Sequence, residues 1–219
     1  MGLHKRKAQA LEEFEEWSGK YDRSILNILI FKRSHRMILK KVLRKAGANT
    51  STFRILDIGC GTGTFLAGCL ATGLDIEATG LDLSFSMIHK AQAKAESFKA
   101  DKPAISFIVG DAEQLPFESG YFDMVSCSNS FHHYPDQPRA VREMRRVLKN
   151  DGELMIIDGH RDDPLGYLIY EVLTVAIEKD IGYCSRRRFM ELLKEAGFKK
   201  VSQQPRGLFP PLLATWGRL

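Results

Sequence analysis

Three glycines at alternate positions, Gly59, Gly61 and Gly63, form the part of the sequence best suited to hold a ligand. They follow an apolar run that is typical of a buried strand and precede a segment that is typical of a helix. Without Cβ atoms, the backbone can turn sharply and a ligand can approach it closely. The N-terminus of the following helix adds N–H groups and the positive end of a dipole. The turn is therefore predicted to bind the polar part of a nucleotide-like cofactor.

Acidic residues stand at the ends of three predicted strands. Asp57 directly precedes the turn, Asp82 follows Gly63 by nineteen positions, and Asp111 comes after a third apolar run. A carboxylate at the tip of a second strand can accept both hydroxyls of a ribose. Simpler interpretations stay open: Asp82 or Ser84 can cap the next helix, Asp111 can start an Asx turn, and Asp57 can shape its own turn.

The spacing of the glycines separates two classes of cofactor. A dinucleotide-binding turn has the pattern G-x-G-x-x-G, whereas here Thr64 or Phe65 occupies the position of the third glycine. The chain instead resembles the class I S-adenosylmethionine (SAM) methyltransferases. Four segments carry this resemblance in the family's order: residues 55–65, 76–84, 109–117 and 122–134. It covers about residues 50–160 in detail and the rest in outline.

The resemblance implies SAM as cofactor and S-adenosylhomocysteine (SAH) as product. It places the glycine turn around the methionine part of SAM, Asp82 at the ribose and Asp111 near the adenine amino group. The cofactor-binding residues that it implies are Asp57, Gly59, Cys60, Gly61, Thr62, Gly63, Asp82, Leu83, Met87, Gly110, Asp111, Ala112, Glu113, Ser128 and Asn129.

Two adjacent histidines, His132 and His133, follow the predicted fourth strand and are candidate catalytic residues. A neutral imidazole there can take up a proton near pH 7. In the alternative interpretation, one ring packs against the sheet edge and the other makes a local hydrogen bond. Tyr21 is a third candidate, because the sequence from Trp17 to Asp22 resembles the W-x-x-x-Y-D segment of family members whose N-terminal helix closes over SAM. Its alternative role is helix packing.

Length and composition suit a single α/β domain without metal. The chain has 219 residues. It contains no run of about 18 uncharged apolar residues, so no membrane-spanning helix is predicted. The N-terminus lacks the apolar stretch of a secretory signal. The four cysteines are scattered without a C-x-x-C pair, which favours reduced thiols in the cytoplasm and disfavours zinc. The acidic cluster at residues 158–163 is better explained by helix capping than by metal binding.

The positive charge is concentrated before the glycine turn. Residues 1–50 carry twelve basic and five acidic residues, a net charge of +7, and the remainder carries −2. Two helices are predicted here, at residues 5–17 and 24–46, the second with an apolar stripe and many basic residues. That basic face is either solvated or a weak contact site for anionic lipid or an acidic substrate. No nucleic-acid partner is expected.

The predicted elements alternate between strands and helices, which implies a mostly parallel sheet with helices on both faces. We expect strands at residues 53–58, 76–82, 104–109, 122–128, 153–159, 199–202 and 208–216, and helices at residues 62–72, 85–98, 136–148, 164–178 and 185–196. The resemblance implies a Rossmann-like seven-stranded sheet with the last strand antiparallel, N-terminal lid helices at 1–50, a SAM-binding core at 51–160 and acceptor-pocket elements at 161–219.

These patterns predict a SAM-dependent methyltransferase that acts on a small, apolar or aromatic acceptor, similar to the quinone-biosynthesis branch of the family. A SAM-binding module without catalysis and a nicotinamide-dependent oxidoreductase are the alternatives. The acceptor, the atom methylated and the oligomeric state stay open.

Overall fold

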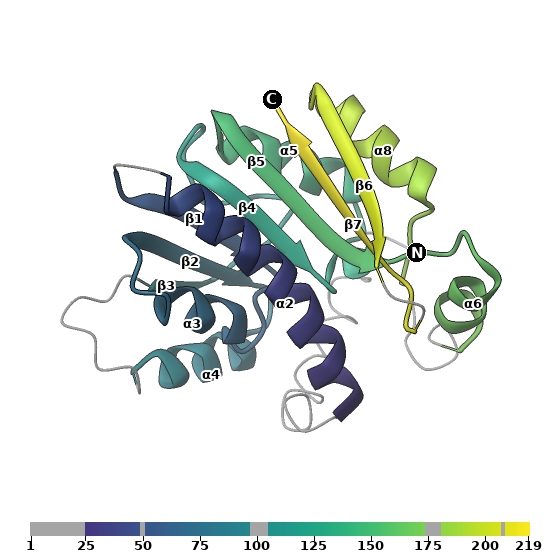
Figure 1. Cartoon of the computed structure of the whole chain (residues 1–219), viewed down its shortest axis with the longest axis horizontal. Coiled ribbons are helices and arrows are strands. Elements are labelled where there is room, and N and C mark those ends of the chain that lie inside the picture. The colour runs from purple at the N-terminus through teal and green to yellow at the C-terminus, as the bar shows by residue number, and fades with distance from the viewer. Residues whose placement is uncertain (1–24, 49–50, 97–104, 174–180, 207–208) are drawn as a thin grey trace.

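A computed structural model describes residues 25–48, 51–96, 105–173, 181–206 and 209–219, which include a seven-stranded sheet (Figure 1). The strand order is β3-β2-β1-β4-β5-β7-β6, and β7 runs antiparallel to both of its neighbours. The strands are β1 (Phe53–Ile58), β2 (Ile76–Asp82), β3 (Ile105–Val109), β4 (Phe122–Ser128), β5 (Leu148–Gly159), β6 (Lys200–Arg206) and β7 (Leu212–Arg218). The predicted fold, including the inserted antiparallel strand, is confirmed.

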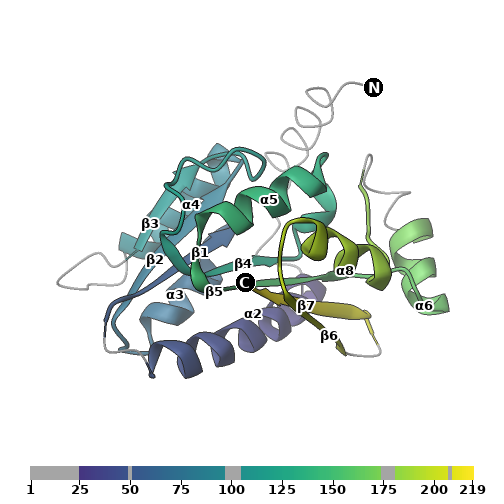
Figure 2. The ribbon, with the colours of Figure 1, turned by 90° about the horizontal axis from the view of Figure 1, so that it is seen from above.

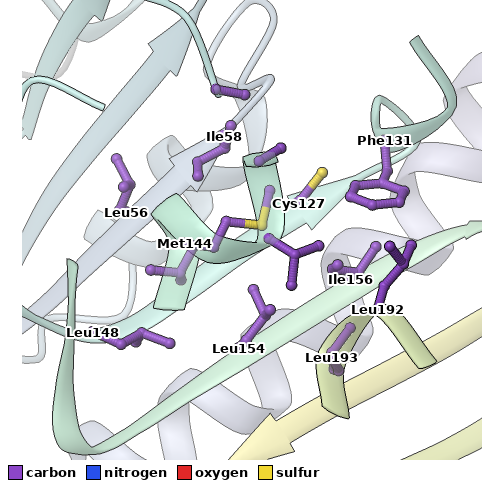
Figure 3. Packing of buried hydrophobic residues seen from close by; sticks show 14 of the residues in the cluster. Leu56, Ile58, Cys127, Phe131, Met144, Leu148, Leu154, Ile156, Leu192 and Leu193 are labelled. Atoms are coloured by element: carbon purple, nitrogen blue, oxygen red, sulfur yellow. The ribbon is translucent and has the colours of Figure 1, made fainter. Parts of the chain in front are cut away.

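Helices cover both faces of this sheet (Figure 2). They are α2 (Ile25–Ala46), α3 (Thr64–Leu70), α4 (Phe85–Glu96), α5 (Gln137–Val147), α6 (Pro164–Tyr167) and α8 (Arg186–Glu195), with a 3₁₀ turn at Phe131–His133 and a π-helical segment at Leu168–Leu173. Helices α2 and α3 bury their apolar residues on one face, and α5 and α8 bury theirs on the other. Figure 3 shows Met144 of α5 and Leu192 of α8 in the core between these two helices and the sheet, against Leu154 and Ile156 of β5.

The second half of α2 is docked on the sheet by core packing and by a buried charge cluster. Ile38 and Val42 are fully buried, and Glu153 of β5 is also fully buried. This carboxylate pairs with Lys41 and Lys45 of α2 and with Arg218 of β7. Burial alone would raise the pKa of Glu153, but the hydrogen bond and charge of Lys41, with the two other cations, hold it below the usual value. The first predicted helix, residues 5–17, lies outside the described residues.

Several predicted boundaries were wrong. Strand β6, expected at 199–202, continues to Arg206. Helix α5 ends at Val147 and β5 begins at once, five residues earlier than expected. In the described part of the helix expected at 164–178, Pro164–Tyr167 is α-helical and Leu168–Leu173 is π-helical. Strand β7 begins at Leu212, because Pro210 and Pro211 cannot donate hydrogen bonds to a ladder. None of the described helices combines the length and the apolar run needed to cross a membrane.

Candidate active site

The glycine turn adopts a backbone that only glycine accepts readily. Gly59, Gly61 and Gly63 have φ angles of 68°, 52° and 71°. The N–H groups of Gly59 and Cys60 donate to the carbonyl of Leu81, at 2.8 and 3.1 Å, and fix the turn against the end of β2. A Cβ on Gly59 would lie 2.2 Å from Ser130 Oγ, whereas a Cβ on Gly61 would meet no atom within 4 Å. The first glycine is therefore needed for packing, and the second leaves the backbone open to a ligand.

Two cavities flank this turn and share Gly59 and Gly61 as lining residues. The first cavity lies at the carboxyl ends of β2 and β4. Besides the two shared glycines, it is lined by Ile58, Leu81, Asp82, Leu83, Met87, Gly110, Asp111, Ala112, Glu113, Asn129, Ser130, His133, Tyr134 and Pro135. The second lies under α2 and is lined by Phe31, Lys32, His35, Asp57, Cys60, Thr62, Thr64 and Ser128. An elongated molecule can therefore lie across the turn, with one end in each cavity.

Asp82 connects the turn to the first cavity. Its carboxylate accepts hydrogen bonds from the N–H groups of Gly61, at 2.8 Å, and Ser84, at 3.0 Å. The helix cap itself is Ser84, whose Oγ accepts from the N–H of Met87 at 3.2 Å. Of the two capping candidates that the sequence offered, Ser84 is therefore the cap, and Asp82 lines the cavity.

Asp111 and Glu113 also line the first cavity. Asp111 Oδ1 accepts from the N–H of Glu113 at 2.9 Å, which is the Asx-type turn anticipated from the sequence. Glu113 is buried, and its Oε1 accepts from the N–H of Asp136 at 2.8 Å. Both carboxylates are thus fixed by the backbone, and Asp111 also lines the cavity.

Asp57 and Lys32 line the second cavity, and Lys94 lies beside the turn. Asp57 is buried, accepts a hydrogen bond from Ser126 Oγ at 2.7 Å, and has its pKa raised by this burial to about 7. Lys94 donates to Thr62 Oγ1 and Thr64 Oγ1, at 2.9 and 2.7 Å. A zwitterionic group suits this arrangement, because its ammonium and carboxylate need opposite partners.

His35 closes the second cavity from α2. Its ring lies 5.6 Å from that of Phe65 and 6.1 Å from that of Phe31, measured between centroids. Burial, with the charge of Lys94, lowers the pKa of His35 to about 4. The side chain is therefore neutral at pH 7 where it lines the second cavity.

The end of β4 is strained and tied to α2. Asn129 has a φ of 54°, the only positive φ of a non-glycine residue in the described ranges, and its Nδ2 donates to the buried Ser34 Oγ at 3.2 Å. Backbone strain of this kind concentrates at functional sites. Ser130 Oγ and Tyr134 OH lie 3.1 Å apart beside Gly59. Sequence reasoning missed the roles of Ser34 and Tyr134, because nothing in their local pattern differs from ordinary packing positions.

The two candidate histidines occupy different places. His133 lines the first cavity, whereas the ring of His132 lies behind it, with centroids 4.1 Å apart. His132 Nδ1 is 2.8 Å from Asp158 Oδ1, an interaction across 26 positions of sequence. The third candidate, Tyr21, lies outside the described residues. Within those residues, no group of three or more His, Cys, Asp and Glu side chains is arranged as metal ligands would be.

Comparison with known proteins identifies the family. The family model described as "Methyltransferase domain" matches residues 56–156. The demethylmenaquinone methyltransferase of Staphylococcus aureus strain JH9 is 35% identical over 153 residues, which are 69% of this chain and 61% of that protein. The chain belongs to the class I SAM-dependent methyltransferase family. It spans about three fifths of the length of the curated methyltransferases it matches.

Solved structures support the methyltransferase fold. A chain of the complex that contains the Haloferax volcanii Trm112 methyltransferase activator matches with a TM-score of 0.71 and 21% identity, over 95% of this chain and 96% of that chain. The YcgJ protein of Bacillus subtilis matches with a TM-score of 0.65 and 24% identity, over 81% and 74%. At these identities the likeness concerns the fold alone.

The candidate site fits the cofactor of this family, SAM. Gly61 leaves the backbone open at the turn, where a Cβ would project into space shared by both cavities. The acidic groups at Asp82 and Asp111 lie in one cavity, and the buried carboxylate of Asp57 lies in the other. These positions match the ends of a molecule that carries a nucleoside on one side and an amino acid on the other.

Proposed function

We propose that this protein transfers the methyl group of SAM to a small-molecule acceptor. The observation that carries the proposal is the pair of cavities that share Gly61. One has carboxylates for a nucleoside, and the other has the buried carboxylate of Asp57 and the ammonium group of Lys32. The family assignment supports SAM over a nicotinamide cofactor. Since the chain spans only 61% of the matched relative, the activity of the whole protein is part of the proposal.

In this proposal each carboxylate recognises one part of the cofactor. Asp82 accepts the ribose hydroxyls, and Asp111 accepts from the adenine amino group, while Met87 and Leu83 contact the adenine ring. Asp57 pairs with the ammonium group of the methionine part. The other predicted cofactor-binding residues that line these two cavities are Gly59, Cys60, Gly61, Thr62, Gly110, Ala112, Glu113, Ser128 and Asn129. Gly63 belongs to the turn but lines neither cavity.

Orientation is the main contribution of the protein to such a reaction. When bound, SAM supplies a methyl group that is activated by a positively charged sulfur. The turn and the end of β4 fix the position of the ligand, and Asn129, which lines the first cavity, is itself held by Ser34 of α2. Held reactants avoid the entropic cost of a bimolecular encounter, which can contribute about 7–11 kcal/mol to lowering a barrier.

We further propose an apolar or aromatic acceptor. The relative's name supports this, since it acts on demethylmenaquinone. The rings of Tyr170 and Tyr183 pack 4.4 Å apart beyond the end of β5, and Leu165, Leu168 and Val172 remain exposed beside them. Apolar side chains near the carboxyl ends of the strands suit an acceptor with little polarity.

A cytoplasmic location with weak contact to anionic lipid completes the proposal. All four cysteines are free thiols. The exposed polar residues of α2 between positions 31 and 46 are all basic, and none of them forms an ion pair within the part of the chain that the structure describes. They are Lys32, Arg33, Arg36, Lys40 and Arg44.

A transfer assay tests the function. The full chain is incubated with methyl-tritiated SAM and, in parallel, with naphthohydroquinone, a phenol, a primary amine, thiophenol and a carboxylic acid. We expect labelled product from at least one acceptor and a loss of most of the activity in Asp82→Ala. Calorimetry that shows SAM binding, with no transfer to any acceptor of the panel, would instead indicate a binding module.

A further inference from the structure

A further cavity lies away from the glycine turn, on the side of α2 that faces β7, and we call it the α2–β7 cavity. It measures about 340 Å³, within the range of about 300–1,000 Å³ that is usual for small-ligand pockets. Figure 1 shows α2 lying across the sheet, with β7 and β6 beside it. None of the residues that line this cavity also lines either cavity of the candidate cofactor site. Its main lining residues are Met37, Lys40, Lys41 and Arg44 of α2, with Met155 and Trp216 of the sheet.

The sheet gives the α2–β7 cavity an apolar floor. Trp216 of β7 stands directly opposite Met155 of β5 in the antiparallel ladder, and opposed residues point to the same face of a sheet. Both side chains belong to the core layer beneath α2, and Met37 packs against the same layer. Thioether side chains adapt their shape to what they contact, and an indole ring suits a boundary between apolar and polar surroundings. The floor is therefore suited to the carbon chain of a ligand.

Cationic side chains of α2 form the rim of the same cavity. They follow Met37 by three, four and seven positions, the spacing that places residues on one face of a helix. Lys41 Nζ lies 4.8 Å from the centroid of the Trp216 ring. Lys40 and Arg44 are exposed and form no ion pair within the part of the chain that the structure describes. The cavity thus combines an apolar floor with a positively charged rim.

The positive charge beside this cavity exceeds what the neighbouring acid can neutralise. The buried carboxylate of Glu153 already pairs with three cations. They are Lys41, Lys45 and Arg218. Burial lowers the pKa of Lys41, and the charges of Arg218 and Arg44 lower it further, against the opposing effect of the carboxylate. An anion bound at the rim would reduce this repulsion between cations, so the electrostatics of the cavity favour an anionic ligand.

We propose that the α2–β7 cavity binds the headgroup of an anionic phospholipid. The inference rests on the lipid contact included in the proposed function and gives that contact a specific site. Lys40 and Arg44 hold the phosphate, because lysine attracts it as a point charge and arginine can donate two hydrogen bonds to it. The glycerol and the first carbons of the acyl chains lie on Met155 and Trp216. The carbon stems of the two cations cover the remaining apolar surface.

The surroundings of the cavity favour a lipid over other anions. Arg33 and Arg36 are exposed and continue the basic surface along α2 outside the cavity. A membrane presents many negative charges in one plane and can meet all of these residues, whereas a free phosphate would meet only the rim. An acidic peptide that adds a strand to the sheet is disfavoured, because the edge strand beside the cavity is β6 and Pro205 in that strand has no N–H to donate.

Trp216 can report on its own cavity. The sequence has two tryptophans, Trp17 and Trp216, so the tryptophan fluorescence of the Trp17→Phe chain comes from Trp216. Dihexanoyl phosphatidylglycerol, added as a monomer below its micelle concentration, should shift this emission to shorter wavelength. Dihexanoyl phosphatidylcholine and inorganic phosphate, at matched ionic strength, should leave it unchanged. An equal response to phosphatidylcholine or to inorganic phosphate would overturn the assignment to an anionic lipid.

Two paired variants of this reporter protein separate the cavity from the overall charge of α2. The rim variant carries Lys40→Gln and Arg44→Gln. The control variant carries Arg33→Gln and Arg36→Gln, which remove the same charge from the same helix outside the cavity. All four positions are exposed, so the melting temperature should change little in either variant. The rim variant should bind dihexanoyl phosphatidylglycerol about tenfold more weakly or worse, and the control variant should stay within about twofold of the reporter protein. Equal loss of affinity in the two variants would overturn the proposal.

Vesicles test the same site in a membrane. Vesicles of phosphatidylglycerol and phosphatidylcholine in equal parts, with bromine near the headgroup end of the phosphatidylglycerol chains, should quench Trp216 in the Trp17→Phe protein. Vesicles of phosphatidylcholine alone should neither bind the protein nor quench it. Sedimentation of the protein with the brominated vesicles without quenching of Trp216 would overturn this site. Calorimetry with SAH reports the cofactor site in parallel, so a failure of lipid binding with intact SAH binding would overturn this inference and leave the proposed methyl transfer standing.

Discussion

The proposed cofactor half and the proposed acceptor half of this site are built in different ways. The cofactor half is made of main chain: three glycines with positive φ and the backbone of Leu81 and Ser84 hold one another within short stretches of sequence. The acceptor half depends on side chains that meet from distant positions, such as His132 and Asp158. The contrast teaches that a conformational demand on the backbone is visible in sequence, whereas a pairing of side chains across strands is not.

The largest expected effect is in the cofactor half, at Gly59. In Gly59→Ala the new Cβ would lie 2.2 Å from Ser130 Oγ, at a φ of 68° that disfavours alanine. Overpacking and strain together should cost about 3 kcal/mol or more. Thermal unfolding followed by circular dichroism measures this loss, and an unchanged melting temperature would show that the turn can move away from β4.

Gly61→Ala is the matched comparison within the same turn. Its Cβ would meet no protein atom within 4 Å, so only the strain of a positive φ, about 1–2 kcal/mol, should be lost in stability. The new methyl group would instead lie where the two cavities meet. We expect SAH affinity to fall much more than stability in this variant. Equal damage to stability in both glycine variants would contradict the division between a packed and an open position.

Asp82→Ala should have the next largest effect. Removing a charged acceptor should weaken SAH binding by about 1.5–3 kcal/mol. The hydrogen bonds from Gly61 and Ser84 are lost at the same time, so some stability is lost as well. Asp82→Asn, which keeps one accepting oxygen, serves as the control in calorimetry. Unchanged affinity in a folded Asp82→Ala protein would show that this carboxylate only supports the turn.

Asp57 should give the ligand-free protein a pH-dependent loss of stability. Burial raises its pKa from 3.8 to about 7, so the folded state binds the proton more tightly than the unfolded state. Ionisation between about pH 4 and pH 7 therefore destabilises the folded protein. Asp57→Asn removes this term, and its melting temperature should gain on that of wild type as pH rises from 5 to 8. A difference that is independent of pH would contradict the raised pKa.

The smallest effect is expected for Asp111→Asn. The amide oxygen can still accept from the N–H of Glu113, so the local turn and the melting temperature should be retained. Loss of one charge-assisted hydrogen bond to adenine should lower SAH affinity by about 1 kcal/mol. Calorimetry of this variant beside Asp82→Ala ranks the two carboxylates, and a stronger effect at Asp111 would reverse the proposed order.

Most of the sheet could be predicted from the sequence because its signals are local. The apolar runs that contain Asp57 and Asp82 predicted β1 and β2 with their observed limits. The two prolines before Leu212 indicated a difficulty in the predicted last strand, which begins after them. The change from α5 directly into β5 was not predictable. Helix α5 ends at Val147 because the chain pairs with β4 from Leu148 onward, and this pairing is a tertiary contact.

The acceptor side was less predictable for the same physical reason. Adjacent histidines signalled a role for His132 or His133 but gave no means of choosing between them. The structure distinguishes them by the contact of His132 with Asp158, whose sequence context is equally typical of a strand end. Likewise, the buried Glu153 that fixes α2 shows its significance only when Lys41, Lys45 and Arg218 surround it.

The most direct test of the account is isothermal calorimetry of the folded, ligand-free wild-type protein with SAH, followed by NADH. Both cavities and the shared glycine turn predict one SAH site per chain, weakened by Gly61→Ala and Asp82→Ala, and no heat of binding with NADH. Absence of SAH binding to a folded wild-type protein, or binding that neither variant weakens, would contradict the claim that the two cavities form one cofactor site.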